Sequence, residues 1–348
     1  MAMRMGKSVV GLNIEPGYVA AVRTAPGGVA VEHAATATLP AGAVRDGEVS
    51  DVETLAEVLK TMFAEHKLAR RVRIGIANQR IVMRTIELPP LKDAKQLASA
   101  IRFHAQDHIP MPLDQAVLEH HAVGTVQTPE GPRTRVVLVA ARRDMILTIL
   151  DVARRAGLRP EGIDLSAFAM IRALHQPGSD ERTLYLSVGG MTNLAIAQGS
   201  TCLFTRTIGL GTEGLATELA ERRGLTLDHA QAWLQHVGLQ APIEDLEGDP
   251  AIIEESRHVL IDGARRIADE VRNTLEFHRA QSASEGVSAA VLTGPAVAIP
   301  GFSDGLAREI DVPLQARLAL EARPGAFGTV DPTLLAVAAG LTVEEVPA

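Results

Sequence analysis

Short apolar segments separated by turns rich in glycine and proline open the chain. The first three, Ser8–Ile14, Val19–Val22 and Val29–Ala34, predict an antiparallel β-meander. A capping box at Ser50-Asp51-Val52-Glu53 then begins a segment with apolar residues at helical spacing. Another apolar run, Val72–Ile76, predicts a strand. The first unit is therefore predicted to contain three strands, a helix and a further strand.

The same order of elements recurs in the second half of the chain. Its predicted elements are the strands Leu184–Val188, Asn193–Ala197 and Cys202–Ile208, helical segments from Gly214, and a strand Ser288–Thr293. Two units with one element order indicate duplicated α/β halves that face each other across a cleft. This is the plan of the actin-like ATPases.

Two segments interrupt this plan. Residues 84–157 predict a small inserted α/β subdomain. Its elements are a strand Arg84–Leu88, a helix from Asp93 that Pro110 stops, strands Val117–Val126 and Arg135–Ala140, and a helix from Asp144 to Gly157. In the second half, Thr226–Gln281 is mainly helical, with a long amphipathic stretch.

Composition narrows the function classes. The 348 residues carry 34 Lys and Arg against 42 Asp and Glu, a formal charge of −8, without a cluster of basic residues. A nucleic-acid partner is therefore not expected, because phosphate neutralisation needs grouped cations. The single cysteine, Cys202, excludes an intrachain disulfide framework and fits a reducing compartment. With no apolar run long enough to span a bilayer, we expect a cytoplasmic protein with no direct membrane span.

Two local patterns have chemical alternatives that we weigh and set aside. Gly209–Gly214 matches G-x-G-x-x-G, but helix rather than a second strand follows it, which favours a tight corner over a dinucleotide site. His104 and His108 lie one helical turn apart, a spacing that suits a metal ion. The H-E-x-x-H pattern is absent, so a surface or packing role is favoured and no metal is expected.

The two strand-turn-strand corners are the more informative positions. In a two-lobed nucleotide-binding fold, such turns approach the phosphates from opposite sides through backbone N–H groups. The second corner supplies Gly189, Gly190 and Thr192, whereas the first supplies Asn13, Glu15 and Gly17. Ordinary β-turn chemistry explains both corners equally well without a ligand.

Ordered short matches to one family run along nearly the whole chain. They are Gly11-Leu12-Asn13-Ile14, residues 84–89 and 101–110, Ala156–Pro160 with Ile163-Asp164, Phe204–Gly209, Leu292-Thr293-Gly294, and Ala338–Leu341. In these stretches the chain resembles the PilM family of type IV pilus assembly proteins, which is related in fold to FtsA. The resemblance implies a two-lobed actin-like ATPase fold, a duplicated RNase H-like architecture, with an inserted α/β subdomain 1C.

The resemblance also implies four subdomains and two binding sites. Residues 8–83 with 158–180 would form subdomain 1A, 84–157 subdomain 1C, 181–214 with 282–345 subdomain 2A, and 215–281 subdomain 2B. ATP would bind in the cleft between the lobes. The expected cofactor-binding residues are Asn13, Gly17, Gly189, Gly190, Thr192, Gly211 and Gly294.

The expected partner is the cytoplasmic N-terminal peptide of a PilN-like inner-membrane protein, with pilus motor ATPases as further candidates. In the family this peptide lies in a groove between subdomains 1A and 1C. The residues expected to bind it are Arg84, Ile86, Leu88, Ile101 and His104. An extended peptide gains affinity by pairing with a strand edge and filling apolar pockets. Leu88 and Ile101 fit an ordinary core position equally well.

The chain departs from the family where nucleotide chemistry is concentrated. Asn13, Glu15 and Ala20 stand at the Asp, Gly and Lys positions of the first phosphate loop, and Ser187 stands at the Asp of the second. Gly294-Pro295 replaces a Gly-Gly pair, and Leu234 aligns with a nucleotide-contacting Lys. We therefore expect ATP binding to be weak or absent, Mg²⁺ to be missing and hydrolysis to be negligible.

Two functions of different classes follow. The first is a pilus or secretion-machine adaptor, held at the inner membrane by its partner, with a degenerate nucleotide site. The second is a working ATP-dependent enzyme such as a sugar-kinase-like phosphotransferase. Such an enzyme needs a carboxylate base and a Mg²⁺-positioning Asp. Since Asn13 and Ser187 occupy the two phosphate-loop positions, the sequence favours the adaptor.

Overall fold

Five strands form the sheet of the first half. The computed structural model describes residues 9–25, 30–90, 93–129, 131–282, 286–318 and 326–343, so Ser8 and Val29, the expected starts of two strands, lie outside the described residues. The strands are β1 (Val10–Glu15), β2 (Tyr18–Thr24), β3 (Val31–Thr38), β6 (Arg71–Ile76) and β10 (Arg159–Leu165). Their order is β3-β2-β1-β6-β10, with the first three antiparallel and β1, β6 and β10 parallel. The predicted meander is therefore confirmed.

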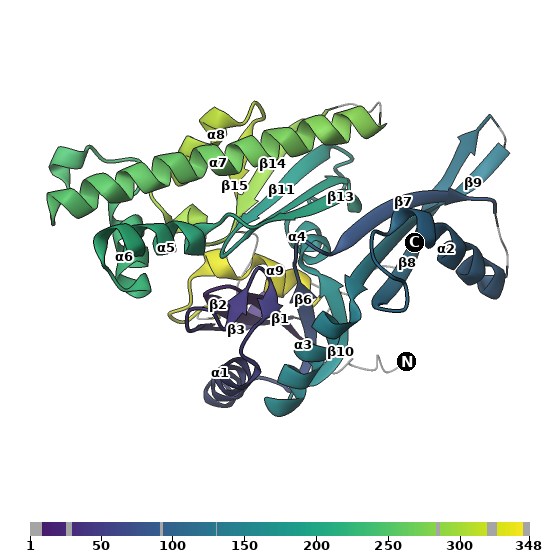
Figure 1. The fold of residues 1–348 in the computed structure, drawn as a ribbon, viewed down its shortest axis with the longest axis horizontal. Coiled ribbons are helices and arrows are strands. Elements are labelled where there is room, and N and C mark those ends of the chain that lie inside the picture. The colour runs from purple at the N-terminus through teal and green to yellow at the C-terminus, as the bar shows by residue number, and fades with distance from the viewer. Residues whose placement is uncertain are drawn as a thin grey trace.

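The second half repeats this sheet. Its strands are β11 (Arg182–Val188), β12 (Thr192–Gln198), β13 (Thr201–Ile208), β14 (Ala289–Thr293) and β15 (Leu314–Ala316). Their order is β13-β12-β11-β14-β15, again three antiparallel strands followed by two parallel ones. The two sheets lie one above the other in Figure 1, the first below and the second above. The duplicated two-lobed fold is confirmed.

Helices α1 (Val52–Glu65) and α3 (Arg143–Arg155) pack on the first sheet. Apolar residues of both, including Leu59, Phe63, Ile149 and Val152, share one core with residues of β1 and β6. The residue that caps α1 is Asp51 rather than Ser50. Asp51 accepts hydrogen bonds from both the backbone N–H and the hydroxyl of Thr54, which a capping residue one position earlier would not reach.

The last helix of each half crosses to the other lobe. Helix α4 (Ser166–Leu174) follows the first sheet but packs against β11, β12 and β14, whereas α9 (Ala336–Gly340) follows the second sheet but packs against β1 and β2. Glycine makes this crossing possible. A Cβ at Gly340 would lie 1.8 Å from the Ala169 carbonyl oxygen, and one at Gly11 would lie 1.8 Å from that of Ala338. The two lobes are thus joined by backbone packing at their centre.

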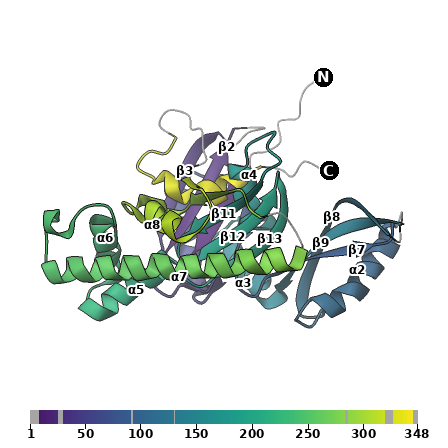
Figure 2. The same ribbon diagram turned by 90° about the horizontal axis from the view of Figure 1, so that it is seen from above.

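The insertion between β6 and β10 carries its own sheet and helix. The elements are β7 (Val82–Leu88), α2 (Ala94–His108), β8 (Ala116–Thr128) and β9 (Gly131–Arg142), with the strand order β7-β9-β8. This unit extends sideways from the two lobes, as Figure 2 shows from above. Helix α3, which the predicted range 84–157 includes, packs instead with the first lobe. The boundaries of the four subdomains stay a prediction.

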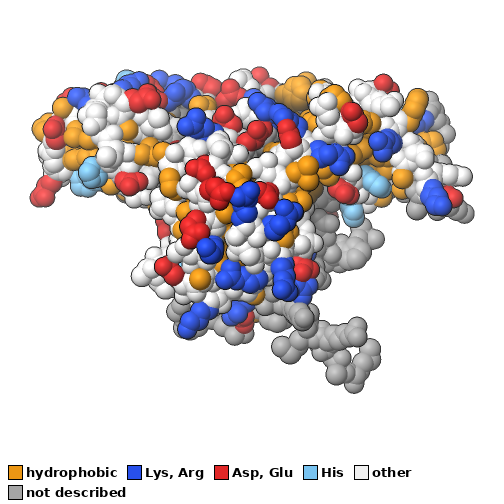
Figure 3. All heavy atoms as spheres, turned by 60° about the horizontal axis from the view of Figure 1, so that its bottom comes forward, with side chains coloured by type: hydrophobic (Ala, Val, Ile, Leu, Met, Phe, Trp, Pro, Cys, Tyr) orange, Lys and Arg blue, Asp and Glu red, His pale blue; other side chains and the backbone are white. Residues whose placement is uncertain are grey.

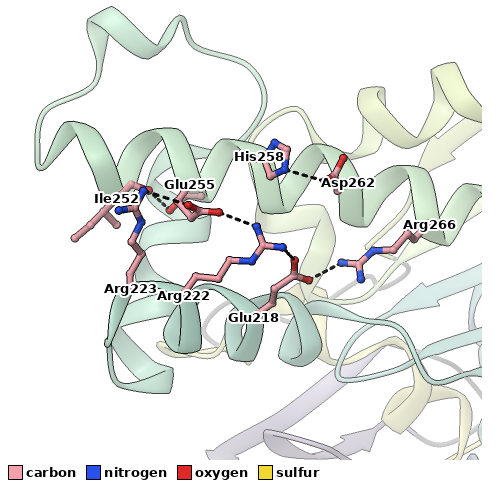
Figure 4. A network of polar contacts seen from close by, with 9 residues as sticks. Glu218, Arg222, Arg223, Ile252, Glu255, His258, Asp262 and Arg266 are labelled. Carbon is pink, nitrogen blue, oxygen red and sulfur yellow. Dashed lines mark hydrogen bonds and ion pairs between the residues drawn. The ribbon is translucent and has the colours of Figure 1, made fainter.

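Three helices lie between β13 and β14. They are α5 (Thr212–Arg223), α6 (Leu227–Val237) and the 33-residue α7 (Pro250–Ser282). Figure 4 shows one ion pair within α5, between Glu218 and Arg222, and three that join α5 to α7: Glu218 with Arg266, and Glu255 with Arg222 and with Arg223. Their side chains are 21–46% exposed, so this network lies at the surface.

The remaining elements are short. They are the hairpin β4 (Val44–Arg45) and β5 (Glu48–Val49), helix α8 (Phe302–Glu309), and the single turns η1 (Ile243–Asp245), η2 (Pro295–Ala298) and η3 (Pro332–Leu334). On the face drawn in Figure 3, basic and acidic side chains are interspersed. Within the described residues, every helix is too short or too polar to cross a bilayer.

Candidate functional site

The tips of two hairpins meet between the lobes. Pro16 and Gly17 form the turn between β1 and β2, and the positive φ of 88° at Gly17 suits the third position of a type II turn. Gly189, Gly190 and Met191 form the matching turn between β11 and β12. The contact is close, because a Cβ at Gly190 would lie 2.3 Å from the Pro16 carbonyl oxygen. Only glycine at position 190 permits this approach.

The structure gathers the seven predicted cofactor-binding residues around these tips. Gly211 lies against the second turn, where a Cβ would be 2.3 Å from the Gly189 carbonyl oxygen, and Gly294 lies against Val188. Thr192 is buried, and its hydroxyl donates a 2.7 Å hydrogen bond to the Leu210 carbonyl. The fold therefore brings the predicted cofactor-binding residues together. The contacts described above are contacts with other parts of the protein. Whether they bind a nucleotide stays a prediction.

A hollow of about 250 Å³ opens beside the tips. Sequence reasoning missed several of the side chains that line it: Tyr18, Thr212, Glu213, Gln231, Gln235 and Asp331. A second hollow of about 420 Å³ shares Gly17, Thr38 and Gln231 with the first and adds Asp228. Gln231 and Gln235 are one turn apart on α6, a spacing that was visible in the sequence. The other residues come together only through the turns and the tertiary fold.

The charge of this cleft is negative. Among the described residues that line the two hollows, Glu213, Asp228 and Asp331 are acidic, and none is Lys or Arg. Burial raises the pKa of Glu213. A polyphosphate would thus approach carboxylates without a cationic side chain to offset the repulsion, which is stronger at the low effective dielectric of a cleft.

Glu15 occupies the junction of the two tips. It is 4% exposed, and the nearby Met191 backbone N–H and Asn13 side chain act to lower the pKa of its carboxyl. Burial raises its pKa to about 7, with a smaller contribution from the nearby Glu213. Burial also raises the pKa of the neighbouring Tyr18 phenol. At the position where the resemblance led us to expect a glycine, this chain places a buried carboxyl.

The positions expected to lack metal-positioning carboxylates are both buried and close to the tips. Asn13 on β1 is the register partner of Gly75 on the neighbouring strand β6. Ser187 on β11 is the register partner of Asn193 on β12. Neither side chain carries the charge that would hold hydrated Mg²⁺. Whether the site accepts a metal-bound nucleotide stays a prediction.

The predicted partner-binding residues divide into two groups. Ile86, Leu88 and Ile101 are at most 6% exposed and pack together in the core between α2 and the inserted sheet. This burial favours the core alternative for these three. Arg84 is exposed on β7, and His104 is half-buried on α2 beside the exposed ring of Phe103. Arg84 and His104 remain available to a partner, and their role stays a prediction.

The inserted sheet has two outer strands, and they face different lobes. Strand β7 begins beside β13, where the Met83 and Cys202 sulfur atoms are 3.9 Å apart. Strand β8 begins beside α3, where Arg143 donates a hydrogen bond to the Ala116 carbonyl. The sequence pointed only to β7. The edge of β8, with the exposed His120 and His121, was missed because the strand order of the sheet was unknown.

Comparison with known proteins identifies the family. The sequence model of the type IV pilus assembly protein PilM matches residues 17–319. This chain belongs to the PilM family. A solved PilM–PilN type IV pilus biogenesis complex contains a chain with 25% sequence identity and a TM-score of 0.80, covering 96% of this chain and 97% of that one.

More distant structures share the fold of this PilM family member. The ethanolamine utilization protein EutJ from Carboxydothermus hydrogenoformans has 14% identity and a TM-score of 0.57, covering 97% of this chain and 89% of its own. MreB5 of Spiroplasma citri bound to ADP has 13% identity and a TM-score of 0.55, covering 96% and 94%. The actin-like fold expected from the sequence is confirmed.

The structure also shows where the G-x-G-x-x-G motif and the His104–His108 pair lie in this PilM-family fold. The G-x-G-x-x-G turn ends β13 and opens α5, and α6 and α7 follow before the next strand, β14, so it lacks the context of a dinucleotide site. His104 and His108 lie on α2. Among the described residues, no three His, Cys, Asp or Glu side chains gather closely enough to hold a metal ion.

Proposed function

We propose that this PilM family member is a cytoplasmic adaptor of a type IV pilus or related secretion machine. It binds the cytoplasmic N-terminal peptide of a PilN-like inner-membrane protein, and through that partner it is peripheral to the inner membrane. The similarity to a PilM–PilN complex over 96% of the chain is the observation that carries this proposal. Pilus motor ATPases are further partners of the proposed adaptor.

The inserted unit offers a physical means of binding such a peptide. It presents outer strands whose backbone N–H and C=O groups on one side have no strand partner among the described residues. An extended peptide can add a strand at such an edge, with affinity from main-chain hydrogen bonds and specificity from neighbouring side chains. Arg84 lies on one of these edges and carries a charge that can select the peptide.

The nucleotide site of the proposed adaptor is degenerate. Four features support this: the buried Glu15 at the junction, the contact of Pro16 with Gly190, the acidic lining and the side chains of Asn13 and Ser187. ATP binding is therefore weak or absent.

An ATP-dependent enzyme is the alternative. A phosphotransferase of this fold needs a carboxylate that accepts a proton and an Asp that positions Mg²⁺. Glu15 adjoins the first tip, but it is buried and is not among the residues that line the hollow beside the tips. This arrangement supports the adaptor over the enzyme.

Titration of the protein with a PilN-like N-terminal peptide tests the adaptor function and shows which outer strand of the inserted sheet binds the peptide. Arg84→Glu should weaken binding about five- to tenfold, because a charge at the rim of an interface is reversed. Lys95→Glu, an exposed site at the start of α2, is the matched control and should bind normally. If His121→Glu lowered the affinity for the peptide and Arg84→Glu did not, the peptide would bind at β8 instead of β7. Absence of binding by the wild type would contradict the adaptor.

Turnover of Mg-ATP tests the degenerate site. The purified protein should hydrolyse ATP no faster than a heat-denatured sample, because neither Asn13 nor Ser187 can hold hydrated Mg²⁺. The measurement is phosphate release across a range of ATP concentrations. Saturable release well above the denatured sample would favour the enzyme.

A further inference from the structure

The outer strand of the first sheet borders a groove on the side of the lobe away from the inserted unit. Strand β3 is the last in the order β10-β6-β1-β2-β3, and helix α1 packs beside it (Figure 1). A hollow of about 490 Å³ lies between the two elements. Residues 36–38 of β3 line one side, and α1 lines the other from Thr54 to His66. We call this hollow the β3–α1 groove.

The backbone of β3 faces the groove with its open edge. Three consecutive strand residues, 36–38, line the groove, and since neighbouring side chains point to opposite faces of a sheet, the groove adjoins the strand edge. Strand β2 pairs with the other side of β3, and no further strand pairs with it within the described ranges. Natural sheets usually protect such an edge with Lys, Pro or an inward charge. Residues 34–38 read Ala-Ala-Thr-Ala-Thr and carry none of these, so an added strand can pair here.

Helix α1 forms the floor and the far wall of the groove. Its lining residues recur three and four positions apart, so they form one stripe along the helix: Thr54, Glu57, Val58, Thr61, Met62 and Glu65. Val58 and Ala37 are only partly buried against the core of the first lobe, so a bound chain covers apolar surface. The stripe is about 18 Å long, which matches about five residues of an extended chain.

The charge of the groove is negative. The titratable residues among its described lining are Glu57, Glu65 and His66, and none is Lys or Arg. Lys60 pairs with Glu57 at 3.1 Å, but the two side chains are 57% and 68% exposed, so water screens this pair. Two copies that met edge to edge at β3 would bring the acids of both α1 helices together, because a two-fold interface places the same patch on both sides. The charge therefore favours a basic partner over a second copy.

We propose that the β3–α1 groove binds an extended, basic segment of a second protein, which adds a strand to β3. Alternate apolar side chains of that segment cover Ala37 and Val58, and its Lys or Arg side chains face Glu57 and Glu65. The inference goes beyond the proposed function, because this groove lies at the other end of the first sheet from β10 and uses no residue of the inserted unit. With two separate peptide sites, one protein joins two partners.

Fluorescence anisotropy with a labelled synthetic peptide tests this site on the full chain. The lysine probe alternates lysine with valine, and the glutamate probe replaces each lysine by glutamate. The wild type should bind the lysine probe at least about tenfold more tightly, because the glutamate probe meets Glu57 and Glu65 with like charge. Thr61→Trp fills the groove from an exposed site on α1 and should weaken binding of the lysine probe at least about tenfold. Ala64→Trp, exposed on α1 outside the groove, is the matched control and should bind normally.

Hydrogen exchange with the lysine probe present locates the contact. Protection should appear in residues 34–38, and equally in Arg84→Glu, which alters a different strand. Glu65→Lys replaces Thr61→Trp if that variant does not fold, and it should likewise weaken binding. Failure of the wild type to bind the lysine probe, equal affinity for both probes, or normal binding by folded Thr61→Trp would each overturn the proposal. Self-association of the wild type that Thr61→Trp abolishes would also overturn it, and would assign the groove to a second copy.

Discussion

The two halves of this protein share one strand order but differ at the tips that face each other. In the second half, Gly189 and Gly190 keep the turn between β11 and β12 open to a close approach. In the first half, Glu15 and Pro16 fill the equivalent place with a carboxyl and a ring. Both tips are supported by the same strand order, so the difference lies in the side chains and in the turn length, two residues in the first half and three in the second. A duplicated scaffold can thus be retained while the chemistry at its centre changes.

The halves also differ in what they insert. The first half adds a sheet and one helix between β6 and α3, whereas the second has the α-helices α5, α6 and α7 between β13 and β14 where the first has α1 between β3 and β6. Both additions leave the five central strands unchanged. The inserted sheet presents outer strands, which suits peptide binding, whereas in the second half ion pairs join α5 to α7.

The strongest test of the shared scaffold is the crossing of α4 and α9. Gly340→Ala should lower the free energy of unfolding by about 3 kcal/mol, because the added methyl overlaps the Ala169 carbonyl in a packed core. Gly11→Ala should cost a similar amount if the two crossings are equivalent. Urea unfolding measures both changes.

Gly214→Ala is the matched control for these two variants. Gly214 lies in α5 with open space around its Cβ position, so alanine should be neutral or stabilise the helix by up to about 1 kcal/mol. A loss at Gly340 no larger than that at Gly214 would contradict the close packing of the two lobes.

The buried carboxyl of Glu15 at the first tip should make the free energy of unfolding depend on pH. The pKa of Glu15 is about 7 in the folded protein and 4.5 in an ordinary environment. Between these pH values the unfolded chain releases a proton that the folded chain keeps, so this group lowers stability as pH rises from 4.5 to 7. The total loss is on the order of 3 kcal/mol, at about 1.36 kcal/mol for each pKa unit.

Glu15→Gln removes this titration. The variant should match the wild type near pH 4.5 and exceed its stability at pH 8, because a neutral amide replaces a buried carboxylate. Urea unfolding across this pH range gives the difference between the two proteins. A constant difference at every pH would show that Glu15 does not titrate between 4.5 and 7. Glu57→Gln, at a mainly exposed site on α1, serves as the comparison.

The smallest effect is expected in the ion-pair network of the second half. Glu218→Gln removes the negative charge that Arg222 and Arg266 share and should cost up to about 1 kcal/mol at low salt. Partly exposed pairs are screened by salt, so the cost should shrink in 1 M NaCl. Thermal melting at the two salt concentrations measures this. A cost that does not change with salt would indicate that Glu218 acts through packing.

Local sequence patterns were sufficient to predict most of the strands and helices. The turn residues and apolar runs predicted the meander, and helical spacing predicted α1 and α7, because strands and helices place their side chains at fixed periods. The start of α1 was displaced by one residue, since Ser50 and Asp51 can both cap a helix and only the Thr54 contacts select Asp51. The unusual residues at Asn13, Glu15 and Ser187 were also apparent from the sequence.

The sequence by itself determined the strand and helix periods, the two repeated units and the side chains at the hairpin tips, because each depends on residues close together along the chain. Tertiary structure alone decided which side chains share a core. It buried Ile86, Leu88 and Ile101 under α2, and it left β8 as a second outer strand. It also brought Glu15 to Met191, 176 positions further along the chain. Such contacts depend on sheet order and the packing of the lobes, which local periodicity does not encode.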